Sequence, residues 1–132
     1  MAEYTVKQID EMEAIVGGAF KRARAELGVS AFGMNVIDMP PGISDAYPEH
    51  DHAEDGQEEV YVTLSGSAEL EVDGEKLRLE PDKMVRIAPG TMRTVRTGDE
   101  PVRLLIVGGV PGQSYSPPEI SQLGAPDTFS NN

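Results

Sequence analysis

The stretch Glu49–Gly66, EHDHAEDGQEEVYVTLSG, decides how the rest of this chain is interpreted. It contains both histidines of the sequence, His50 and His52, separated by one residue. Because alternate side chains of an extended strand point to the same face, both imidazoles can be directed at one point. A carboxylate, Glu59, follows at the start of a β-rich segment, residues 60–64. Two imidazoles and a carboxylate form a ligand set for a divalent metal; the alternative is a solvated pair of surface histidines.

The order of residues in and around this stretch resembles the first sequence motif of the cupin family. That motif runs glycine, His-x-His, a glutamate after a short loop, then six residues and a glycine. The matching positions are Gly42, His50, His52, Glu59 and Gly66, with slightly longer loops before His50 and before Glu59. The resemblance implies a double-stranded β-helix, or jelly-roll barrel, with a metal held by His50, His52 and Glu59. Imidazole ligands favour Mn, Fe, Ni or Zn over Ca.

Two neighbouring carboxylates compete for the third ligand position. The family spacing selects Glu59, whereas simple alternation would place Val60, Val62 and Leu64 in the core and Glu58 on their face. We expect Glu59 to be the ligand and retain Glu58 as the alternative.

Two further residues of this region are candidates for binding the ligand. Gln57 and Tyr61 flank Glu59 and are predicted to support the site and its ligand. Packing in the core is the alternative role for Tyr61.

The second cupin motif is eroded in this chain. The family pattern is a glycine, then Pro-x-Gly, a histidine and an asparagine. The residues at those positions are Asp82, Ala88, Gly90, Arg93 and Thr97. Arg93 therefore replaces the fourth metal ligand, and a protonated guanidinium cannot donate a lone pair. Either three ligands still hold a metal and Arg93 binds an anionic substrate group, or the guanidinium replaces the charge of the metal and pairs with Glu59.

The pattern along the chain predicts an all-β fold. Asp73-Gly74 is a strong hairpin signal between two alternating segments. Many short strands separated by turn residues are typical of a sandwich or barrel. Strands are expected over residues 29–39, 60–64, 68–72, 77–79, 84–87, 91–97 and 102–107.

The barrel is predicted to span residues 29–112, between an N-terminal arm, 1–28, and an extended C-terminal tail, 113–132. The arm is expected to hold a short helical segment over residues 20–27, with Gly28 as its C-cap. The alternative is that this segment begins a strand that pairs across a dimer. Arg22 and Arg24 are interpreted as surface charges.

Composition narrows the list of partners. The chain has 132 residues, no cysteine and a net charge of -12, which argues against nucleic acid and anionic membranes as partners. The acidic N-terminus lacks the apolar region of a signal peptide, so a cytoplasmic location is expected. A homodimer is also expected, because small cupins associate through sheet faces and the apolar side chains of Val60, Val62 and Leu64 need cover.

Three functions follow as hypotheses. The chain is a small metal-dependent enzyme, such as a dioxygenase or isomerase, that acts on a small polar or anionic molecule. Alternatively, it is a metal-free cupin that binds a small ligand without catalysis. The last possibility is a structural dimer in which the site is vestigial.

Overall fold

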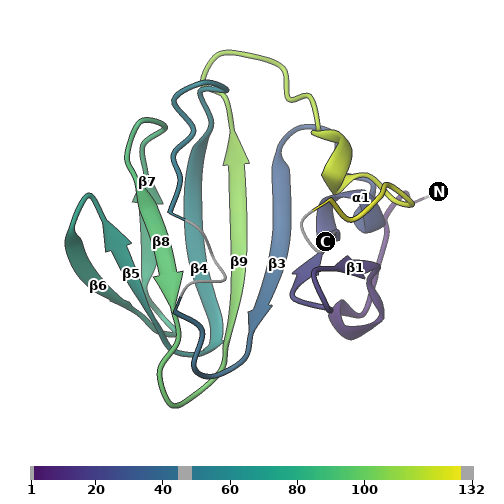
Figure 1. The fold of residues 1–132 in the computed structure, drawn as a ribbon. Coiled ribbons are helices and arrows are strands. Elements are labelled where there is room, and N and C mark those ends of the chain that lie inside the picture. Colours follow the sequence, from purple (N-terminus) through teal and green to yellow (C-terminus); the bar gives the residue numbers. More distant parts are fainter. Residues whose placement is uncertain (1, 45–48, 129–132) are drawn as a thin grey trace.

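A computed structural model describes residues 2–44 and 49–128 and shows two antiparallel β-sheets that face each other (Figure 1). The larger sheet has the order β1 (Ala14–Ile15), β2 (Phe20–Lys21), β3 (Gly33–Met39), β9 (Val102–Gly109), β4 (Glu58–Gly66) and β7 (Met84–Ile87). The smaller sheet has the order β6 (Glu75–Leu79), β5 (Ala68–Val72) and β8 (Arg93–Arg96). The helices are short: η1 (Ile9–Glu11), α1 (Ala23–Leu27) and η2 (Glu119–Ser121). The predicted all-β jelly roll is confirmed.

The hydrophobic core lies between the two sheets. Tyr61, Leu70, Leu79, Val95 and Leu104 are fully buried there, and each comes from a different strand. Full burial of one large apolar side chain contributes about 1.5–3 kcal/mol to the free energy of unfolding. The core therefore fixes which face of each strand points inward.

Glycines allow the backbone geometry at two connections between strands. Asp73 and Gly74 both have positive φ, 47° and 85°, as the tight turn between β5 and β6 requires. Gly66 has φ +73°, and a Cβ there would lie 1.9 Å from the carbonyl oxygen of Pro101. The glycine that ends the first motif is thus needed for close contact between two chain segments.

The N-terminal residues extend the large sheet. Of residues 20–27, predicted as one helical segment, Phe20–Lys21 instead pairs with β3, and only Ala23–Leu27 is helical. Gly28 ends this helix in the left-handed conformation, as predicted, and its N–H donates to the carbonyl oxygens of Arg24 and Ala25. The predicted surface position of Arg22 is wrong, because Arg22 is only 2% exposed.

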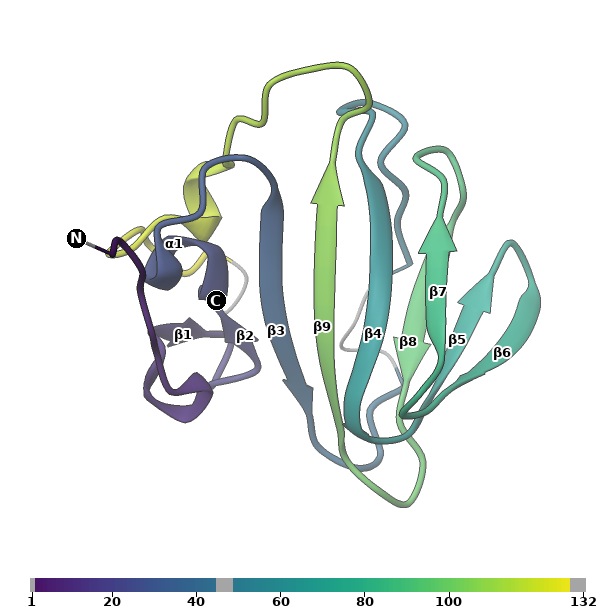
Figure 2. The same cartoon turned by 180° about the vertical axis from the view of Figure 1, so that it is seen from behind.

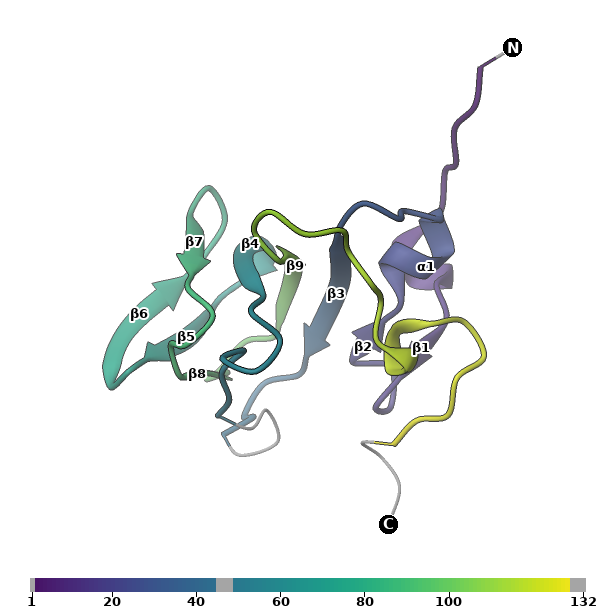
Figure 3. The same cartoon turned by 90° about the horizontal axis from the view of Figure 1, so that it is seen from above.

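The C-terminal segment packs against these N-terminal elements. It leaves the end of β9, crosses over β3 and descends beside α1 and β1 (Figures 2 and 3). Arg22 fixes it there, since its Nε and Nη2 donate to the carbonyl oxygens of Ile120 and Ala125 at 2.9 and 2.8 Å. The described part of the predicted tail is therefore tied to the arm, while residues 129–132 lie outside the described range.

The helices of the described ranges are too short or too polar to cross a bilayer.

Candidate metal centre

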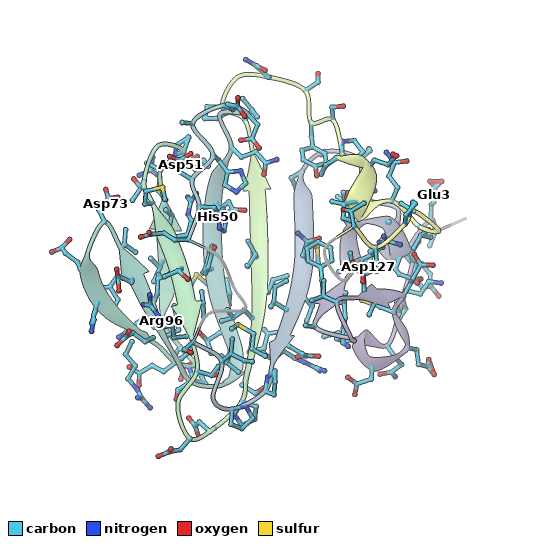
Figure 4. All side chains as sticks on the ribbon, viewed as in Figure 1. Glu3, His50, Asp51, Asp73, Arg96 and Asp127 are labelled. Atoms are coloured by element: carbon cyan, nitrogen blue, oxygen red, sulfur yellow. The ribbon has the colours of Figure 1, made fainter. Side chains whose placement is uncertain are left out.

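The two histidines and Glu59 come together at one end of the barrel. One ligand atom from each of His50, His52 and Glu59 can be chosen so that all lie within 4.8 Å of one another. His50 pairs with Arg93 through two backbone hydrogen bonds of 2.9 and 2.8 Å, which ties the histidine loop to β8. Figure 4 shows His50 beside β4 and β8, on the far side of the molecule from Asp127. The predicted ligand set thus converges inside the fold.

Hydrogen bonds orient the ring of His52. Its Nδ1 lies 2.9 Å from Oδ2 of Asp55, and its Nε2 lies 3.4 Å from Oε2 of Glu59. The bond with Glu59 raises the pKa of His52 above its ordinary value; burial opposes this effect and Asp55 adds to it. His52 would hold a metal through a deprotonated ring nitrogen, so metal binding would compete with protonation of this ring.

Asp55 has the role of a supporting carboxylate. Burial raises the pKa of Asp55, but hydrogen bonds from the backbone N–H of Gln57 and the ring of His52 outweigh this effect and lower it. The charge of Arg93 lowers the pKa further. A carboxylate on one ring nitrogen directs the other nitrogen toward a metal. Asp55 was not predicted as part of the site, although its position three residues after His52 was a usable signal.

The donor set fits a divalent first-row metal. Two imidazoles and one carboxylate form a set that leaves positions open for water or substrate. Oε1 of Glu59 is buried and has no hydrogen-bond partner among the described residues. A buried carboxylate oxygen without a donor is costly, and a bound cation would satisfy it. The rings of His50 and His52, with centroids 5.3 Å apart and an interplanar angle of 87°, do not stack and can approach one ion from two directions.

The register of β4 places the two glutamates on opposite faces of the sheet. Glu59 and Tyr61 share the inward face, whereas the outward Glu58 forms an ion pair with Arg86 of β7. The apolar residues Val60 and Val62 suggested that their face, and not that of Glu59, points into the core. They lie on the outer face, which is apolar because it is itself partly covered. Glu59, the expected ligand, therefore belongs to the candidate metal centre.

Arg93 lies next to this site but not in its cavity wall. Its side chain is fully buried, and Nη2 donates to the carbonyl oxygen of Ala88 at 3.1 Å. Nε and Nη1 have no hydrogen-bond partner among the described residues. Oε1 of Glu59 also has no hydrogen-bond partner among the described residues. This oxygen therefore does not pair with Arg93 as predicted. Its binding to an anionic ligand stays a prediction.

Of the other two predicted ligand-binding residues, only Gln57 lines the cavity. Its Oε1 lies 3.0 Å from the position that a Cβ of Gly108 would take. Tyr61 is fully buried in the core and is absent from the cavity wall among the described residues. Packing, the alternative weighed from the sequence, accounts for Tyr61 in this structure.

The cavity is larger than the ligand set alone requires. It has a volume of about 1780 Å³ and runs from the histidines to the C-terminal segment, where Tyr115 and Ile120 line it. Typical small-molecule pockets have volumes of about 300–1,000 Å³. No pattern in the sequence signalled that residues more than fifty positions beyond Glu59 would line the same cavity.

Known structures share this fold. A cupin protein from Bacteroides fragilis has a TM-score of 0.66 at 22% identity, covering 89% of this chain and 93% of that one. The cupin domain of an XRE family transcriptional regulator from Enterobacter cloacae has a TM-score of 0.54 at 30% identity, covering 64% and 86%. A sugar phosphate isomerase of the cupin superfamily from Silicibacter pomeroyi has a TM-score of 0.57 at 22% identity, covering 74% and 59%.

A search of curated proteins gave no match. The family model of the cupin domain matches residues 35–108, which is more than half of the chain and includes His50, His52, Glu59 and Arg93. This chain belongs to the cupin family.

Proposed function

We propose that this protein binds a divalent first-row metal through His50, His52 and Glu59 and acts on a small molecule that reaches the open positions of that metal. The observation that supports it most strongly is the convergence of three ligand atoms within 4.8 Å, with Oε1 of Glu59 buried and unpartnered among the described residues. A bound metal would supply Lewis-acid or redox chemistry. Dioxygenase and isomerase reactions are the candidates.

The protein's own residues prepare the site for that ligand. Asp55 holds the ring of His52 so that Nε2 points toward Glu59. Gln57 lines the cavity beside Gly108 and can donate a hydrogen bond to a polar ligand group. The buried cation of Arg93 favours a ligand that carries negative charge. The structural relatives at 22% identity support the fold alone, and folds of this kind host many reactions.

Metal content of the purified protein tests this proposal. Wild-type protein dialysed against Mn, Fe, Ni or Zn salts is expected to retain about one ion per chain, by elemental analysis. His52→Ala and Glu59→Gln should lose most of it, because each removes a ligand atom. Glu58→Gln is the matched control and should retain the metal, because Glu58 faces outward to Arg86. Wild-type protein that takes up none of these metals would overturn the proposal.

A metal-free binding protein is the second candidate. It is favoured by Arg93, which is fully buried beside the site and keeps two nitrogens without partners among the described residues. A guanidinium at the position of the second-motif histidine could replace the charge of an ion. If Arg93→His creates metal binding that the wild type lacks, this candidate replaces the first. Arg93→Ala is expected to spare a bound metal and to weaken an anionic ligand.

A homodimer is part of the proposal, with a second copy as the occupant of the outer sheet face. The N-terminal elements cover the half of that face near Val36 and Leu105. On the same face, Leu105 of β9 pairs with Val62 of β4, and Val62 pairs with Met84 of β7. Met84 is 73% exposed. Light scattering should give a dimeric mass, and Val62→Asp should give a monomeric one. A monomeric wild type at micromolar concentration would contradict this expectation.

A further inference from the structure

Two glycines leave open space beside the candidate metal centre. Gly33 of β3 pairs with Gly108 of β9, and Gly108 pairs with Glu59 of β4, so these three residues form one row across the sheet. Neither glycine places a side chain over the row. The row lies at the end of the barrel where the C-terminal segment leaves β9 and crosses toward α1 (Figure 1).

Two polar side chains lie over the space that the glycines leave. A Cβ on Gly33 would lie 2.9 Å from the hydroxyl oxygen of Tyr115. A Cβ on Gly108 would lie 3.0 Å from Oε1 of Gln57 and 3.2 Å from Cγ of Glu59. Since directly opposite Cβ positions of antiparallel strands are about 4.5–5.5 Å apart, the Tyr115 hydroxyl lies within about 12 Å of Cγ of Glu59. A ligand a few carbon atoms long can therefore contact the metal centre and this hydroxyl together.

The polar groups at this end of the cavity are available to a ligand. Tyr115, Gln57 and Asn35, which follows Gly33 on the inner face of β3, all line the cavity and are only partly buried. Over residues 2–44 and 49–128, no hydrogen bond joins any of these three side chains to another residue. A phenol and two amides are uncharged hydrogen-bonding groups that suit hydroxyl and carbonyl oxygens.

The Tyr115 hydroxyl can donate a hydrogen bond at neutral pH. Burial raises the pKa of this group above its ordinary value; the charge of Arg24 opposes the change, and that of Asp55 adds to it. The phenol therefore keeps its proton, and the oxygen that it faces in a ligand must be an acceptor.

Tyr115 belongs to a part of the chain that the family resemblance does not cover. It lies beyond residues 35–108, which match the family model. The segment that follows Tyr115 is fixed to the N-terminal elements, because Arg22 donates to the carbonyl oxygens of Ile120 and Ala125. The position of Tyr115 over Gly33 is thus supported by contacts outside the cupin barrel.

We propose that Tyr115 is a ligand-binding residue of the metal centre, and that its hydroxyl donates a hydrogen bond to an uncharged oxygen of a ligand whose other end binds the metal. This inference rests on the proposed metal site and names its ligand class, a small acid with hydroxyl or carbonyl groups along its chain. A carboxylate suits the open positions of a metal such as Mn²⁺. An alkyl chain in the same place would leave Tyr115, Gln57 and Asn35 without partners, which is costly where water is excluded.

A pair of ligands with equal carbon number tests the class. Gluconate and hexanoate both have six carbons and a carboxylate, but only gluconate carries hydroxyl groups. Titrated into Mn²⁺-loaded wild-type protein with calorimetric detection, gluconate is expected to bind at least about tenfold more tightly, because several hydrogen bonds are gained. Equal affinities, or tighter binding of hexanoate, would overturn the inference.

A matched pair of variants tests the role of Tyr115. Tyr115→Phe is expected to weaken gluconate by about three- to tenfold, the effect of one lost hydrogen bond, and to leave hexanoate affinity and metal content unchanged. Tyr4→Phe is the control, since it removes the same hydroxyl at a position that is 79% exposed and outside the cavity wall. Equal losses for gluconate and hexanoate in Tyr115→Phe would indicate packing alone and overturn the proposed hydrogen bond, as would an unchanged gluconate affinity.

Metal content separates this inference from the proposed metal site. If the wild type takes up no metal, the same titrations are run on metal-free protein with chelator present. A preference for gluconate that Tyr115→Phe reduces would then support the hydrogen bond from Tyr115 although the metal proposal had failed. If the wild type retains metal but shows no preference for gluconate, the inference about Tyr115 fails while the metal site stands.

Discussion

Arg22 and Arg93 are both almost completely buried, yet their surroundings differ. The three guanidinium nitrogens of Arg22 donate to Ile120, Glu13 and Ala125. Arg93 donates from Nη2 to Ala88, and its Nε and Nη1 have no partners in the part of the chain that the structure describes. A buried cation is costly unless it is paired and hydrogen-bonded. Arg22 thus fits a structural role, whereas the buried guanidinium of Arg93 is only partly hydrogen-bonded.

The difference also separates two regions of the molecule. The region around Arg22 joins the N-terminal elements to the C-terminal segment, and its contacts are complete without a ligand. The region around Arg93 combines a buried cation with the unpartnered Oε1 of Glu59. Incomplete pairing of buried polar groups tends to mark functional sites rather than the scaffold. The same substitution at the two arginines should therefore have opposite effects.

The largest effect is expected for Arg22→Met. This change removes three hydrogen bonds, one of them to a carboxylate, and should lower the free energy of unfolding by about 2–4 kcal/mol. Urea unfolding monitored by circular dichroism measures it. Arg78→Met is the control, with an expected change below about 0.5 kcal/mol, because the Arg78 side chain is 63% exposed and its ion pair spans 3.7 Å. An Arg22 variant as stable as this control would show that the contacts of Arg22 contribute little.

A smaller effect of opposite sign is expected for Arg93→Met. In metal-free protein it removes a buried charge that has few partners, so stability should be unchanged or rise by up to about 2 kcal/mol. The same urea titration, with chelator present, provides the comparison with Arg22→Met. A loss as large as that of Arg22→Met would mean that Arg93 supports the fold, and its proposed contribution to ligand binding would lose its basis.

The difference between the two arginines was only partly visible in the sequence. The position of Arg93 could be predicted, because the motif order places it opposite the histidines, and the pairing of His50 with Arg93 agrees. The burial of Arg22 could not be predicted, since its carbonyl partners lie 98 and 103 residues away. Contacts of such separation leave no local periodicity.

The metal centre itself was easier to predict than its surroundings. His50, His52 and Glu59 follow one another within ten residues, so motif spacing identified them. Alternation alone would have selected Glu58, because it assumes that one face of a strand is polar and the other apolar. Both faces of β4 are at least partly covered, and there the assumption fails. Tyr115 was missed because only the path of the C-terminal segment brings it over Gly33.

The smallest effect concerns acid and the Arg22 region. Hydrogen bonds from the backbone N–H of Gly124 and from Arg22 lower the pKa of Glu13 from its ordinary 4.5. A second carboxylate, that of Glu26, accepts a hydrogen bond from the backbone N–H of Glu13. Because the pKa is lower in the folded protein, the stabilisation from Glu13 is present above the unfolded value and is lost as pH falls through the folded value. The contact of Glu13 with Gly124 should therefore weaken in acid while the barrel stays folded.

The amide proton of Gly124 reports this loosening directly. Its chemical shift should titrate with a midpoint below the ordinary pKa of a glutamate, because the pKa of Glu13 is lowered. Glu13→Gln should abolish this titration, because the side chain can still accept the hydrogen bond but no longer changes charge. If the wild-type Gly124 amide does not titrate, or titrates equally in Glu13→Gln, then Glu13 is not what holds the segment. Arg22 would then fix the C-terminal segment through the carbonyl oxygens of Ile120 and Ala125 alone.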